Sequence, residues 1–167
     1  MIRAAINGYG RIGRSVLRAL YESNGCQTIS IIAINEPADC KTIAHLTKYD
    51  STHGKFPGDV DVDGDVLTIN GGTISVFHQD DISNLPWAEL EIDVVLECSG
   101  AFTDRETAQQ HLSAGAKKVV FSQPAESNVD ATIVLGVNEQ ILNGDETIIS
   151  NASCSTNCVV PVIKTLH

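Results

Sequence analysis

A glycine-rich segment near the N-terminus, NGYGRIG (Asn7–Gly13), restricts the possible folds more than any other part of the sequence. It follows the apolar run IRAAIN and precedes RSVLRALYES, where apolar residues recur at helical spacing. Gly8, Gly10 and Gly13 stand in GxGxxG spacing. The first glycine permits a tight turn, the second lets the backbone approach a pyrophosphate, and the third lets the helix pack closely on the strand. A plain tight turn is the simpler alternative, but the strand-to-helix context favours a dinucleotide site.

The second predicted strand is followed by an acidic residue. TISIIAIN (Thr28–Asn35) is nearly all apolar and rich in β-branched residues, as expected for a central parallel strand, and Glu36 comes directly after it. A carboxylate at this position can accept hydrogen bonds from both hydroxyl groups of an adenosine ribose, and it would repel a 2′-phosphate. Glu36 therefore favours NAD over NADP. The alternative is a solvated loop carboxylate.

Helical patterns alternate with the strands. The apolar residues that we expect to face the core from the first two helices are Ile12, Val16, Leu17, Leu20, Ile43 and Leu46. A third helix is predicted in TDRETAQQHLSAG, with Thr103 as the N-cap, Glu106 three residues later and Gly115 as the C-terminal stop.

The remaining strand candidates complete the fold prediction. Residues 59–78 alternate apolar and polar side chains around the turn Asn70-Gly71, which predicts a small antiparallel excursion. IDVVLE, KKVVFS, ATIVLG and TIIS are further apolar runs. Strands that alternate with helices indicate a parallel sheet. We therefore predict an α/β fold with a Rossmann-type, doubly wound and mostly parallel sheet.

Composition excludes several classes of function. The chain has 167 residues, of which 43% are hydrophobic and 19% charged, typical of one globular domain. The net charge of −10 argues against nucleic acid as a partner, because such binding neutralises phosphates with Lys and Arg. No apolar run is long enough to cross a membrane, and no signal sequence is apparent, so we expect a cytoplasmic protein.

The segment SNASCSTNC raises a question about Cys154. The five cysteines are irregularly spaced, which suggests reduced thiols, and CxxxC without a second Cys/His pair argues against zinc there; we predict no metal site. Cys154 lies where the strand TIIS gives way to a helix, at which backbone N–H groups and the helix dipole favour a thiolate. From the residues alone, a nucleophile and a buried thiol are both reasonable. Cys158 is interpreted as a packing residue.

A nucleophilic cysteine usually has a histidine as its base. We expect His111 on a helix surface, His53 in a structural or interface role, and His167 at the chain end. None of them is a convincing base.

Seven segments resemble the phosphorylating glyceraldehyde-3-phosphate dehydrogenase family over nearly the whole chain. They occur in the family's order: INGYGRIGR, LTKYDSTHGKF, LPW, ECSGAF, GAKKVVFSQP, GVNE and SNASCSTNC. The resemblance implies that Cys154 attacks an aldehyde carbon, that hydride passes to the nicotinamide, and that the resulting thioester is released by water or phosphate. Ser153 and Ser155 would contact the substrate or its phosphate.

The resemblance also implies roles in cofactor binding. Arg11 and Ile12 would offer backbone amides to the pyrophosphate, beside the three glycines, and Glu36 would hold the adenosine ribose. Ser99, Gly100 and Ser122 would line the cofactor cleft, with Ser122 toward the nicotinamide. The family often has Arg where this chain has Asp80, near the adenine.

Several details resemble the erythrose-4-phosphate dehydrogenase branch of this superfamily. Residue 36 is Glu where the glyceraldehyde-3-phosphate enzymes usually have Asp, and AINEPAD and SNVDATIVLGVNEQIL also resemble that branch. This resemblance implies oxidation of D-erythrose 4-phosphate to 4-phosphoerythronate, with hydrolysis of the thioester, in pyridoxal 5′-phosphate biosynthesis. The glycolytic enzyme, a non-catalytic NAD-binding or redox-sensing module, and a simple hydroxy-acid dehydrogenase remain as alternatives.

The family pattern places a domain boundary near the cysteine. Residues 1–152 would form the NAD-binding domain, and residues 153–167 would begin the helix that leads into a catalytic domain. The base histidine and most contacts of a homotetramer would belong to that second domain. We therefore expect this chain to fold, to bind NAD weakly and not to turn over by itself.

Overall fold

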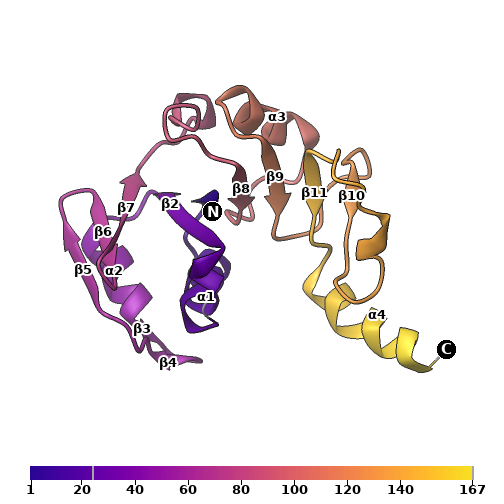
Figure 1. Ribbon diagram of the computed structural model, residues 1–167, viewed down its shortest axis with the longest axis horizontal. Helices are drawn as coiled ribbons and strands as arrows, with labels where there is room; N and C mark the ends of the chain where they lie inside the picture. The colour runs from indigo at the N-terminus through magenta and orange to yellow at the C-terminus, as the bar shows by residue number, and fades with distance from the viewer. Residues whose placement is uncertain (24, 167) are drawn as a thin grey trace.

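The computed structural model describes residues 1–23 and 25–166, and His167 lies outside that range (Figure 1). Its helices are α1 (Arg11–Glu22), α2 (Cys40–Lys48), α3 (Arg105–Ser113) and α4 (Cys154–Leu166), with short 3-10 turns at η1 (Gly25–Gln27), η2 (Ile82–Asn84) and η3 (Glu139–Ile141). Its strands are β1 (Ile2–Asn7), β2 (Ile29–Asn35), β3 (Tyr49–Asp50), β4 (Gly54–Lys55), β5 (Val60–Asp63), β6 (Val66–Ile69), β7 (Gly72–Phe77), β8 (Val94–Glu97), β9 (Lys118–Phe121), β10 (Ala131–Thr132) and β11 (Ile148–Ser150).

Nine of these strands form one sheet in the order β10-β11-β9-β8-β1-β2-β7-β6-β5. Strand β1 pairs in parallel with both β2 and β8, and the chain proceeds outward from this centre in opposite directions. In an open α/β sheet, ligands bind at the carboxyl ends of the strands where the order reverses. The predicted Rossmann-type sheet is confirmed, and its switch point lies between β1 and β8.

The sheet is covered on both faces. Along β1, Ala4 and Ile6 belong to a core cluster shared with Leu17 of α1 and Ile43 of α2, whereas Ala5 belongs to a second cluster with Ala108 of α3. Since successive side chains of a strand point to opposite faces, this division shows that α1 and α2 cover one face and α3 the other.

The antiparallel excursion is confirmed and forms one edge of the main sheet. β5 pairs with β6 and β6 with β7 in antiparallel register, while β7 pairs in parallel with β2. Asn70 and Gly71 both have positive φ angles, 50° and 83°, as a two-residue hairpin turn requires. A separate two-stranded hairpin, β3-β4, follows α2.

Two predicted core positions are wrong. Ile12 in α1 is 53% exposed, and Leu46 in α2 is 37% exposed. Beside Leu46 it is Thr47 that is buried, and its hydroxyl contacts that of Tyr9 at 3.0 Å and also donates to the carbonyl of Ile43. A polar side chain that is satisfied locally can therefore occupy the inward position that hydrophobicity alone assigned to its neighbour.

The N-cap of α3 is also displaced from its predicted position. Asp104, not Thr103, caps the helix, and its carboxylate accepts hydrogen bonds from the Thr107 backbone N–H at 2.7 Å and from the Thr107 hydroxyl. Gly115 follows the helix with φ of 111°, as predicted for a C-terminal stop. Of the strand candidates, ATIVLG shortens to the two residues of β10.

Helix α4 extends away from the end of β11 (Figure 1). None of its described residues is buried, and its exposed apolar side chains are Val159, Val162, Ile163 and Leu166. Pro161 lies inside the helix, which nevertheless continues to Leu166. Among the described residues, no helix is long and apolar enough to cross a membrane.

We expect Leu17→Ala to lower the free energy of unfolding by about 2–4 kcal/mol, because Leu17 is completely buried between α1 and the sheet. Ile12→Ala in the same helix should change it by less than about 0.5 kcal/mol, because Ile12 is mostly exposed. Urea denaturation of both variants measures the difference. Equal losses would contradict the orientation of α1 described here.

Candidate functional site

Each of the three glycines of GxGxxG is required for a different structural reason. Gly8 has φ of 85°, and a Cβ there would collide with the backbone of Ser99, which shows how closely β1 approaches the end of β8. A Cβ at Gly13 would meet the Gly8 carbonyl oxygen and the side chain of Ile6. Around Gly10, by contrast, the space is open. Two glycines thus permit close packing, and the middle one leaves the backbone accessible to a ligand.

Glu36 lies against this glycine loop. One carboxylate oxygen accepts a hydrogen bond from the Tyr9 backbone N–H at 2.6 Å, and the other is 3.4 Å from the Ala38 backbone N–H. The bond to Tyr9 fixes the carboxylate between the end of β2 and the turn. Because a carboxylate has about four acceptor positions, Glu36 keeps capacity for further donors such as ribose hydroxyls.

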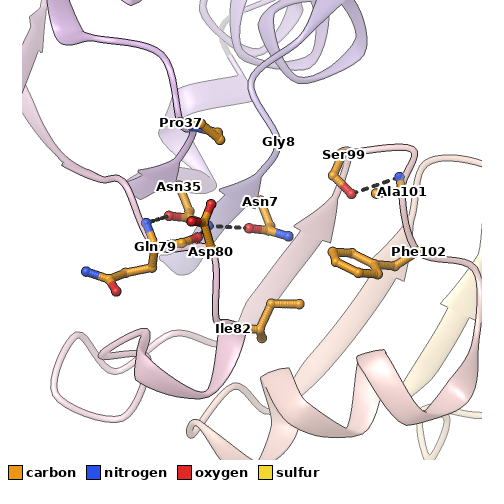
Figure 2. Close-up of a pocket in the computed structure, with 10 residues that line it drawn as sticks. All are labelled: Asn7, Gly8, Asn35, Pro37, Gln79, Asp80, Ile82, Ser99, Ala101 and Phe102. Atoms are coloured by element: carbon orange, nitrogen blue, oxygen red, sulfur yellow. Dashed lines mark hydrogen bonds between the residues drawn. The ribbon is translucent and has the colours of Figure 1, made fainter.

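Two buried asparagines connect the carboxyl ends of β1, β2 and β7, as Figure 2 shows. The Asn35 amide donates to the Asn7 side-chain oxygen at 2.8 Å and to the Gln79 carbonyl, and its own oxygen accepts from the Gln79 N–H at 2.9 Å. These bonds satisfy the side chains of Asn7 and Asn35, which are 3% and 5% exposed, and they fix the floor of the cleft.

The buried carboxylate of Glu97 is at the centre of this region. It accepts hydrogen bonds from the Asn7 amide at 2.6 Å, from the Ser99 backbone N–H at 2.8 Å and from His111 Nε2 at 3.2 Å. Burial alone would raise its pKa, but the bonds from His111, Ser99 and Asn7 outweigh it, so the pKa of Glu97 lies below the usual value. Glu97 is therefore an ionised group inside the fold.

His111 is fully buried, so its predicted position on a helix surface is wrong. The Trp87 indole N–H donates to His111 Nδ1 at 3.0 Å, which makes Nδ1 the acceptor. The proton of a neutral imidazole then lies on Nε2, which donates to Glu97. The histidine connects the Trp87 segment to the end of β8 and has a structural role.

A cavity of about 250 Å³ opens at the switch point. Its lining residues are Asn7, Gly8, Asn35, Pro37, Gln79, Asp80, Ile82, Ser99, Ala101 and Phe102 (Figure 2). They come from the ends of β1, β2, β7 and β8, so the cavity lies where a doubly wound sheet binds its ligand. Asp80, where the family often has Arg, is one of its walls.

The predicted cofactor residues surround this cavity without all lining it. Gly8 and Ser99 line it, whereas Gly10, Arg11, Ile12 and Gly13 belong to the adjoining loop and the first turn of α1. Glu36 lies beside that loop through its bond to Tyr9. Gly100 has φ of 72° with open space around it, and Ser122 follows β9, where its hydroxyl contacts the Gln123 side chain. The roles assigned to these residues remain predictions.

Cys154 is exposed at the first position of α4. Ser153 precedes the helix, and its hydroxyl oxygen accepts from the Thr156 backbone N–H at 3.0 Å and contacts the hydroxyls of Thr156 and Ser155. Ala152 has φ of 57°, in the left-handed region that is rare for alanine. A capped helix start and a strained backbone hold the thiol outward at the carboxyl end of β11.

Cys158 and Cys98 lie in contrasting environments. Cys158 is exposed on α4, so the prediction that it packs in a core is wrong for this chain. Cys98 is buried directly after β8, and its burial raises the pKa of the thiol to about 11. In residues 1–23 and 25–166, no histidine hydrogen-bonds the Cys154 sulfur.

Sequence reasoning missed Asn7, Asn35 and Glu97, although a signal was present. Each is a polar residue at the last position of an apolar strand run, in IRAAIN, ISIIAIN and VVLE. Since the carboxyl ends of parallel strands share one edge, polar residues at those positions should converge on it.

We expect Glu97→Gln to lower the free energy of unfolding by about 1–3 kcal/mol, because an amide would face donors of Asn7, Ser99 and His111 with its own NH₂ group. Glu89→Gln, on the exposed surface, is the matched control and should have little effect. Chemical denaturation at neutral pH makes the comparison.

The difference in unfolding free energy between wild type and Glu97→Gln should become smaller as the pH falls. The folded-state pKa of Glu97 is lowered, so its stabilising contribution is present above the unfolded value, about 4.3, and is lost as the pH falls through the folded-state pKa. The stability advantage of wild type over Glu97→Gln should therefore be lost in acid. A gap that widened below pH 4 would show that Glu97 is protonated in the fold.

Comparisons with known proteins agree with this geometry. Residues 2–105 match the family model described as glyceraldehyde 3-phosphate dehydrogenase, NAD binding domain. The chain is 55% identical, over 166 residues, to both the chromosomal and the plasmid glyceraldehyde-3-phosphate dehydrogenase of Cupriavidus necator. These alignments cover 99% of this chain and 49% of each relative, so the chain spans about half the length of the curated relatives it matches.

The glycine loop, the switch-point cavity and the sequence match lead to one assignment. The chain belongs to the family of NAD-binding domains of glyceraldehyde-3-phosphate dehydrogenases.

Proposed function

We propose that this chain is the NAD-binding half of an NAD-dependent dehydrogenase that oxidises glyceraldehyde 3-phosphate through a thioester on Cys154. The observation that carries the proposal is the exposed thiol at the start of α4, on the same sheet edge as the dinucleotide loop. A hydroxy-acid dehydrogenase or a simple NAD-binding module would not need a thiol presented in this way. A redox-sensing module would also use an exposed thiol, but both curated relatives are named as dehydrogenases, which supports the catalytic role.

The relatives support the three-carbon aldehyde over the four-carbon one. Both are named glyceraldehyde-3-phosphate dehydrogenase, and neither name supports D-erythrose 4-phosphate or pyridoxal 5′-phosphate biosynthesis. The features that still favour the erythrose branch are the segments AINEPAD and SNVDATIVLGVNEQIL and, within the first of them, Glu36, where the glyceraldehyde-3-phosphate enzymes usually have Asp. Glu36 faces the dinucleotide loop rather than Cys154, so it bears on the cofactor more than on the aldehyde.

The residues around the loop fit NAD. Gly10 leaves open space beside the N-terminus of α1, where N–H groups of Arg11 and Ile12 are free to face a pyrophosphate. Glu36 would hold the ribose, while Ser99, Gly100 and Ser122 would border the rest of the cofactor. Asp80 would lie near the adenine as one wall of the cavity.

Cys154 would act by adding its sulfur to the aldehyde carbon, with Ser153 and Ser155 beside the substrate or its phosphate. Bound NAD would supply the hydride acceptor that turns this adduct into a thioester. Ser153 already uses its hydroxyl to cap α4, so it would orient Cys154 as well as contact the substrate. The base is proposed to lie in a second domain after residue 167, together with most contacts of a homotetramer.

Glu36→Gln should weaken NAD binding by about 10- to 100-fold, because a charged acceptor for ribose hydroxyls is lost. The same change should strengthen NADP binding relative to NAD, because repulsion of the 2′-phosphate is removed. Isothermal titration of both nucleotides against this chain measures the ratio, with Glu89→Gln as the control. A general weakening toward both nucleotides would instead indicate damage to the loop.

The complete gene product should oxidise glyceraldehyde 3-phosphate in preference to erythrose 4-phosphate and should require inorganic phosphate. Cys154→Ser should lower kcat/KM by at least about a thousandfold, whereas Cys158→Ser should leave most activity. Steady-state kinetics with each aldehyde, with and without phosphate, makes the test. A phosphate-independent preference for the four-carbon aldehyde would restore the erythrose branch.

A further inference from the structure

Three side chains of ligand type meet at one end of α2, outside the cleft described above. They are Cys40 at the first position of α2, Asp65 in the turn between β5 and β6, and His78 directly after β7. The Cys40 sulfur is 3.8 Å from a carboxylate oxygen of Asp65 and 3.7 Å from His78 Nε2, and Nε2 is 3.6 Å from the same Asp65 oxygen. Three segments far apart in sequence thus bring one sulfur, one nitrogen and one oxygen together.

We propose that Cys40, Asp65 and His78 form a binding site for a divalent transition-metal ion of the zinc type. A point equidistant from three atoms separated by 3.6, 3.7 and 3.8 Å lies about 2.1 Å from each of them, which is the mean separation divided by √3. Zinc bonds are about 2.3 Å to sulfur, 2.0–2.1 Å to imidazole nitrogen and 2.0–2.2 Å to carboxylate oxygen. An ion slightly above the plane of the three atoms meets these lengths with little movement.

The histidine is already in the tautomer that a metal requires. Its Nδ1 is 2.7 Å from the backbone carbonyl oxygen of Glu36. A carbonyl oxygen only accepts, so Nδ1 carries the proton, and in the neutral imidazole Nε2 presents a lone pair toward Cys40 and Asp65. A ligating histidine held through its other nitrogen by a carbonyl is the usual arrangement around bound metals.

Hydrogen bonding among the three groups does not explain their approach. A separation of 3.6 Å between Nε2 and the Asp65 oxygen is too long for a hydrogen bond. Both sulfur contacts are weak, because a thiol is a poor donor and a poor acceptor. Cys40 is only 7% exposed, and its sulfur has these two groups as its polar neighbours among the described residues.

Charge and access also suit a divalent cation. With the Cys40 thiolate and the Asp65 carboxylate, a doubly charged ion forms a neutral centre, so its partial burial costs little. The Asp65 side chain is 77% exposed and that of His78 is 34% exposed, which leaves an open path from solvent. On binding, Cys40 loses its thiol proton to the buffer and forms the sulfur–metal bond. Water would take a fourth position, and a small contraction of the three ligands would complete the tetrahedron.

The test uses this chain without an affinity tag and with Cys154→Ser and Cys158→Ser as the parent background, which removes the two exposed thiols. Titration with Zn²⁺ against a chromophoric chelator measures stoichiometry and affinity. Titration with Co²⁺ reports thiolate ligation through a charge-transfer band in the near ultraviolet. We expect one equivalent of each ion and a thiolate-to-cobalt band.

Variants with matched controls assign the ligands. Cys40→Ser and His78→Gln should each lower zinc affinity by at least about a hundredfold and abolish the cobalt band, and Asp65→Asn should lower affinity by at least about tenfold. The corresponding controls, Cys26→Ser, His45→Gln and Asp63→Asn, should bind as the parent does.

The proposal is overturned if the parent takes up no stoichiometric metal, or if the three ligand variants bind as tightly as their controls. Asp65 lies on an exposed turn, so Asp65→Asn should fold even where substitution of the more buried Cys40 does not. Circular dichroism of each variant separates loss of a ligand from loss of the fold.

Discussion

The dinucleotide site depends on the hydrogen bonds that the buried carboxylate of Glu97 accepts. A charge inside a protein is costly unless it is hydrogen-bonded on several sides, and Glu97 has donors from β1, from the segment after β8 and from α3. These bonds hold the carboxyl ends of β1 and β8 together at the point where the strand order reverses. The approach of Gly8 to Ser99, which leaves no room for a Cβ, takes place at this same junction.

Hydrogen bonds continue from Glu97 to the residues that line the cavity. Asn7 donates to Glu97 and accepts from Asn35, which in turn is bound to Gln79. Four segments are therefore positioned by one chain of directional bonds rather than by apolar packing alone. Such bonds fix geometry closely because each has a preferred distance and angle, and a cofactor cleft needs backbone atoms held in place.

The parts of the fold that could be predicted are those encoded locally. GxGxxG after an apolar strand, Asn70-Gly71 between alternating residues and Gly115 after a helix each follow from the conformations available to a few adjacent residues. His111 and Leu46 could not be placed in the same way. Helical periodicity says that His111 is on a helix, but its burial depends on Trp87 and Glu97, which are 24 and 14 residues away. The convergence of Cys40, Asp65 and His78 is hidden for the same reason.

Glu36 links the two sites proposed for this chain. Its carboxylate accepts from the Tyr9 N–H in the glycine loop, and its main-chain carbonyl accepts from His78 Nδ1. A metal on Nε2 would draw electron density from the ring and make the Nδ1–H a stronger donor, which would hold the Glu36 backbone more firmly. In the proposed arrangement, the ion would act on the dinucleotide site through His78 and Glu36. Its effect on NAD affinity would come from preorganising the ribose-binding carboxylate, since ordering a binding group beforehand lowers the entropic cost of association.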